Sequence, residues 1–152
     1  RNTKFTMEYK ILLVLHTLGA CVWVGGHLIL AITILPKALK LRDPGIISTF
    51  ESMFERIGIP SLIIQVLTGL RLAMIFLPIS EWFDFSNSIS RLISIKIILL
   101  LMTVALAIHA RFYIIPKLDA DKLSLLGWHI IGVTIIAVLM LLTGLSFKLG
   151  II

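Results

Sequence analysis

Ionisable side chains inside long apolar runs are the feature of this sequence that points to chemistry. They are His16, His27, Arg71, Lys96, His109 and His129. Such side chains are costly in hydrocarbon, so each is a candidate functional residue. Imidazole is a good ligand for copper, zinc and haem iron. The histidines therefore predict a metal centre within a membrane.

The composition supports a membrane setting. Of 152 residues, 59% are hydrophobic and 14% are charged, and the mean hydropathy is +1.07. Soluble domains are about 45–50% apolar and about 25% charged. These values exclude a soluble globular enzyme, a disordered chain and a nucleic-acid-binding domain, although the formal charge is +6. A single cysteine excludes an internal disulfide.

Four apolar runs are long enough to cross about 30 Å of hydrocarbon as helices. They cover residues 11–35, 59–79, 92–115 and 128–150. The sequence thus predicts a single integral membrane domain over residues 1–152, folded as an all-α bundle of four transmembrane helices. The amphipathic stretch 46–56 predicts a short interfacial helix between the first two spans. Pro60 would then lie in the first turn of the second span.

A repeated pattern suggests two tandem helical hairpins. The first span ends in Leu35-Pro36-Lys37 and the third in Ile115-Pro116-Lys117, while the second and fourth spans each contain Leu-Thr-Gly-Leu, at 67–70 and 142–145. Two spans per repeat predict halves related by an axis along the membrane normal.

Four spans place both termini on one side of the membrane, here called side A, together with the 80–91 loop. Side B then carries seven basic residues against five on side A, so the positive-inside rule places side B in the cytoplasm. The expected location is a bacterial inner membrane, with the termini on its non-cytoplasmic side. The expected partners are the lipid bilayer and a redox partner or quinone, with no nucleic acid. Small residues such as Gly19, Ala20 and Gly69 would permit a homodimer.

Three of the four histidines gather in the side-B half. At about 1.5 Å per residue, His27 lies about 6 Å and His109 about 7 Å from mid-span towards side B. His129 begins the fourth span on the same side. His16 lies on the same face of the first helix as His27, since 11 residues at about 100° each return to nearly the same direction. His16 matches Lys96 in depth towards side A, and these two would form a second polar site.

Our leading hypothesis is a b-type haem held by His27 and His109, in an electron-transfer protein or a haem-dependent oxidoreductase. Lys96, Arg71 and Arg111 would pair with the haem propionates. The alternative is copper bound by His27, His109 and His129. A third hypothesis is a non-catalytic membrane subunit, which would bind neither.

Several phrases resemble the CopD-like (copper resistance protein D) membrane proteins. They lie at residues 16–27, 54–60, 67–70 and 107–111, and the likeness covers residues 11–150. This resemblance implies copper homeostasis or resistance.

The spacing of His16 and Trp23, with Lys96 on the third span, is also similar to the HemJ-type protoporphyrinogen oxidases. These form a related four-helix group thought to use haem b. The resemblance implies that His16 and Lys96 would take the functional roles of that group's first-span histidine and later lysine.

Overall fold

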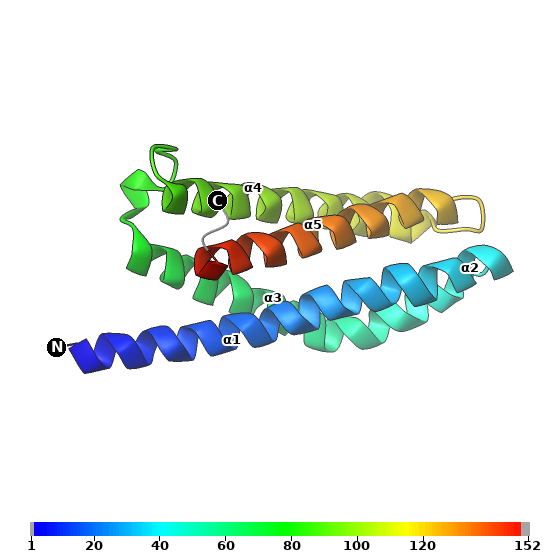
Figure 1. Cartoon of the computed structure of the whole chain (residues 1–152). Helices are drawn as coiled ribbons and strands as arrows, with labels where there is room; N and C mark the ends of the chain where they lie inside the picture. The colour runs from blue at the N-terminus through cyan, green and yellow to red at the C-terminus, as the bar shows by residue number, and fades with distance from the viewer. Residues whose placement is uncertain (1, 150–152) are drawn as a thin grey trace.

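A computed structural model of the chain describes residues 2–149, so Arg1 and the predicted end of the fourth span at Gly150 lie outside the described residues. The described chain is all-helical (Figure 1). Its α-helices are α1 (Asn2–Ile29), α2 (Leu35–Leu41), α3 (Gly45–Phe76), α4 (Ser88–His109) and α5 (Leu123–Leu149). Two π-helical segments, η1 (Leu30–Ile34) and η3 (Ala110–Ile114), and two short 3-10 turns, η2 (Ile79–Glu81) and η4 (Ile115–Lys117), complete it.

Four continuous helical stretches are long and apolar enough to span a membrane. They are Thr6–Leu41, Gly45–Phe76, Ser88–Lys117 and Leu123–Phe147. The protein is therefore an integral membrane protein with four spans, as predicted. The 32 residues of α3 make a helix about 48 Å long, which exceeds the hydrocarbon thickness, so this helix tilts or projects from the bilayer.

The four spans form two hairpins, which confirms the predicted tandem arrangement. α1 packs along α3, and α4 packs along α5, while α1 against α5 is the main contact between the hairpins. Figure 1 shows the first pair below and the second pair above.

The two π segments strengthen the evidence for an internal repeat. η1 begins at Leu30 and η3 at Ala110, an offset of 80 residues (110 − 30). The same offset separates Pro36 from Pro116. Each hairpin thus widens its first helix by one π segment just before the same proline-lysine pair.

The segment between the first two spans differs from the sequence-based prediction. Residues 46–56 form the beginning of α3 rather than a separate interfacial helix, and Pro60 lies inside α3 rather than in its first turn. The chain reverses earlier, at Arg42, whose backbone is left-handed with φ 52°. Proline in a helix interior removes one backbone hydrogen bond, and the packing of α3 along α1 outweighs this loss.

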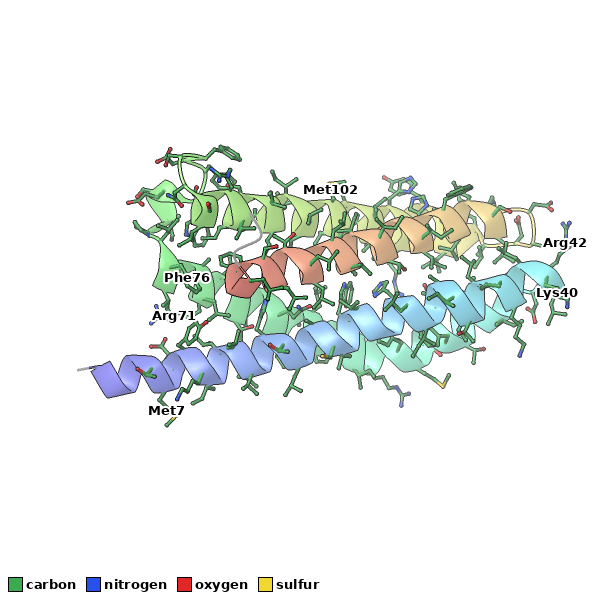
Figure 2. All side chains as sticks on the ribbon, viewed as in Figure 1. Met7, Lys40, Arg42, Arg71, Phe76 and Met102 are labelled. Atoms are coloured by element: carbon green, nitrogen blue, oxygen red, sulfur yellow. The ribbon has the colours of Figure 1, made fainter. Side chains whose placement is uncertain are left out.

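A hydrophobic core joins the hairpins at the side-B end. Its buried residues are Leu30, Leu35, Ala38, Ile47, Ile114, Leu123, Leu126 and Ile130. At the same end an exposed ion pair joins Arg42 to Asp121 at 2.8 Å. Figure 2 places Arg42 at the far end of the bundle from Met7. The side-B histidines therefore lie beside the best-packed part of the interface between the hairpins.

Candidate metal centre

The structure brings together two of the predicted ligands, His109 at the end of α4 and His129 in α5. Nδ1 of His109 lies 2.9 Å from Nε2 of His129. The rings are nearly parallel, with 13° between their planes and 5.0 Å between centroids. Tyr113 also stacks on His109, at 5.4 Å and 21°. Antiparallel packing of α4 on α5 places these residues at one level.

Hydrogen-bond partners assign the protons of this histidine pair. His129 Nδ1 lies 3.0 Å from the carbonyl oxygen of Leu125, one helical turn earlier. A carbonyl only accepts, so Nδ1 of His129 carries the hydrogen and Nε2 accepts one. His109 Nδ1–H therefore donates to His129, and the lone pair of His109 Nε2 is left without a polar partner among the described residues. Histidine ligands in metal sites are commonly oriented by such a backbone carbonyl.

His27 lies in a different, aromatic environment. Its Nδ1–H donates to the carbonyl of Trp23 at 2.8 Å, and its ring lies 4.4 Å from that of Trp23 and 6.0 Å from that of Phe54. Thr134 of α5 donates to the carbonyl of His27 at 3.2 Å. No contact joins His27 to the histidine pair in the described chain. Nor does any set of three or more His, Cys, Asp or Glu residues there form a ready metal site.

His16 and Lys96 lie at one level, as their predicted depths suggest. His16 Nδ1 lies 3.0 Å from both the Gln65 carbonyl and the Thr68 hydroxyl. His16 packs against Gly69, since a Cβ there would lie 2.9 Å from the ring. Lys96 Nζ likewise lies 3.3 Å from the Cβ position of Gly144.

These contacts follow the repeat. His16 and Lys96 are 80 residues apart (96 − 16), and each lies against the glycine of a Thr-Gly pair on the other helix of its hairpin. The Lys96 charge is also close enough to act on the His16 ring. The second polar site therefore has equivalent contributions from both hairpins.

The two arginines predicted to pair with propionates have carboxylate partners within the chain. Arg71 Nε donates to Glu8 at 2.7 Å, which joins α3 to α1. Figure 2 shows Arg71 at the same end of the molecule as Met7. Arg111 in η3 pairs with Glu55 in α3. The sequence-based analysis missed Glu8, because it began the first span at residue 11.

The Arg71–Glu8 pair is partly exposed, at 48% and 36% of the two side chains. Exposed ion pairs contribute about 0–1 kcal/mol. We therefore expect Glu8→Gln to lower the free energy of unfolding by less than about 1 kcal/mol, measured by denaturation in mixed micelles. A larger loss would mean that this pair is a main connection between α1 and α3.

An apolar groove of about 420 Å³ opens between α1 and α3. Its lining includes Cys21, Gly25, Gly26, Met53 and Phe54, and none of the predicted haem ligands. Apolar grooves of this kind face acyl chains in a membrane, so this groove does not add to the candidate metal centre.

Comparison with known protein families matches residues 49–147 to copper resistance protein D (CopD). The match covers more than half of the chain. The protein belongs to the CopD family. Comparisons with curated proteins and with solved structures found no match to the chain.

The matched segment of this CopD protein contains both members of the histidine pair, whereas His16 and His27 precede it. The family therefore favours copper, the alternative interpretation, over the haem that we expected first. Neither the family match nor the described contacts provide evidence for haem. The donors fit copper, because imidazole nitrogen is among its good ligands.

Proposed function

We propose that this CopD protein handles copper in the membrane and takes up the ion at the His109–His129 pair. The observation that carries this proposal is the 2.9 Å approach of two imidazole nitrogens within the segment matched to the family. In this proposal copper is cargo that takes the place of the proton shared between the rings.

The pair is suited to adjusting around an ion. Bonds from imidazole nitrogen to a metal such as zinc are about 2 Å long, so the nitrogens would separate by about 1 Å to admit an ion of similar size. His109 is exposed and His129 half-buried, which leaves the His109 ring free to move. The Leu125 carbonyl would keep His129 in its present orientation.

His27 would add a third ligand only if its ring left Trp23 and Phe54, so we propose the pair as the primary ligands. We also propose that side B, with its excess of basic residues, faces the cytoplasm of a bacterium. The pair would then take up or release copper near the cytoplasmic surface. A quinone or redox partner and a homodimer stay predictions.

The test is a Cu(I) titration of the detergent-purified protein against a chromophoric chelator, with an absorption spectrum before and after dithionite. We expect about one Cu(I) per chain and no Soret band. Zn²⁺ in the same assay would report whether the site selects copper. A protein that binds no copper under these conditions would overturn the proposal, and a Soret band that sharpens on reduction would restore the haem hypothesis.

A further inference from the structure

A single ion pair connects the π segment beside His109 to the first hairpin in the described chain. Arg111, the second residue of η3, pairs with Glu55 of α3. His109 is the last residue of α4 and comes directly before η3. Any rotation of η3 about its axis therefore moves His109 as well, because the two share a continuous helical backbone.

We propose that Glu55 and Arg111 are positioning residues that set the rotation of η3 and so hold His109 on His129. This inference rests on the proposed copper function of the pair. The other constraints on η3 are Ile114, which is buried in the side-B core with 2% of its surface exposed, and Tyr113, which stacks on His109 itself. Of these three contacts, only Arg111–Glu55 links η3 directly to α3.

The internal repeat separates this role from a merely structural one. The residue equivalent to Arg111 in the first hairpin, 80 positions earlier, is Ala31 of η1. The first π segment therefore forms without a charged partner at this position. Arg111 is thus an addition to the hairpin that carries the histidine pair, and its loss should move η3 without unfolding it.

The two roles predict different measurements. A partly exposed ion pair contributes little to stability, whereas residues that orient metal ligands commonly change metal affinity by about 10–100-fold. The matched control is Glu8→Gln, which breaks the Arg71–Glu8 pair between α1 and α3. Neither Arg71 nor Glu8 adjoins a π segment.

We expect Glu55→Gln to weaken Cu(I) binding by about tenfold or more, while Glu8→Gln leaves Cu(I) affinity unchanged and shifts the melting temperature by a similar small amount. Exchanging the charges in a Glu55→Arg, Arg111→Glu double variant should restore affinity to within about threefold of the wild type. Arg111→Gln provides a second variant if Glu55→Gln does not fold.

A copper-free measurement separates this inference from the proposed function. In protein labelled with ¹⁵N-histidine, the His109 Nδ1–H···His129 Nε2 bond should give a nitrogen–nitrogen coupling by NMR. The coupling should be present in the wild type and Glu8→Gln and lost in Glu55→Gln. If wild type binds copper and Glu55→Gln keeps both affinity and coupling, the inference is wrong and the function stands. If wild type binds no copper, the function is wrong and the coupling alone decides whether Glu55 positions His109.

Discussion

Replacing His129 with alanine is expected to weaken Cu(I) binding by about a hundredfold or more. The variant removes one of the two nitrogens that lie 2.9 Å apart, and His109 alone cannot hold the ion between two donors. A hundredfold loss corresponds to about 2.8 kcal/mol, at about 1.4 kcal/mol for each factor of ten. The same chelator competition measures the change, and His109→Ala should give a loss of the same size.

His16→Ala is the matched control, because it also removes a half-buried histidine from an apolar helix. His16 bonds to Gln65 and Thr68 rather than to the pair, so its loss should leave Cu(I) affinity within about twofold. Unchanged binding in His129→Ala together with lost binding in His27→Ala would move the copper site to His27. Equal losses in all three variants would support the original set of three histidine ligands.

The level of each residue in the membrane could be predicted from the sequence, but its direction around the helix could not. Helical rise alone placed His109 and His129 near one depth and His16 near Lys96, and the structure brings both sets together. His27 has nearly the predicted depth of His109, yet its ring lies against Trp23 and Phe54. Its partners depend on how α1 is rotated against α3, which the sequence alone does not specify.

The repeat was readable because it lies in turn-forming and small residues. Leu/Ile-Pro-Lys and Thr-Gly recur at fixed positions, and the structure adds a π segment before each proline. The ion pairs were not readable in this way. Arg71 and Glu8 are 63 residues apart and Arg111 and Glu55 are 56 apart, so each pairing requires knowledge of which helix faces align.

Pro60 and the length of α3 show a second limit. A proline near an apolar run is typical of a helix start, which made residue 59 the predicted beginning of the second span. The helix instead begins at Gly45, after Pro44. Packing against α1 decides this outcome, because Phe54 lies against the bare backbones of Gly26 and Gly58.

Gly19→Ala is expected to destabilise the first hairpin by about 1–3 kcal/mol, the usual cost of overpacking a tight contact. A Cβ at Gly19 would lie 2.7 Å from Gln65 Cγ and 2.9 Å from the backbone oxygen of Ser61. The side chain of Gln65 can rotate, but the Ser61 carbonyl belongs to α3, so the whole helix must move away. This displacement should also weaken the His16 bond to the Gln65 carbonyl.

Gly25→Ala on the same helix is the control that isolates this contact. No atom of another residue lies within 4 Å of its Cβ position, so only the helical preference of alanine changes, which favours the folded state by about 0.5–1 kcal/mol. The two variants should therefore change the free energy of unfolding in opposite directions when measured in the same mixed micelles. If Gly19→Ala were as stable as Gly25→Ala, α1 and α3 would be less closely packed than this contact requires, and the position of His16 against Gly69 would have to be reconsidered.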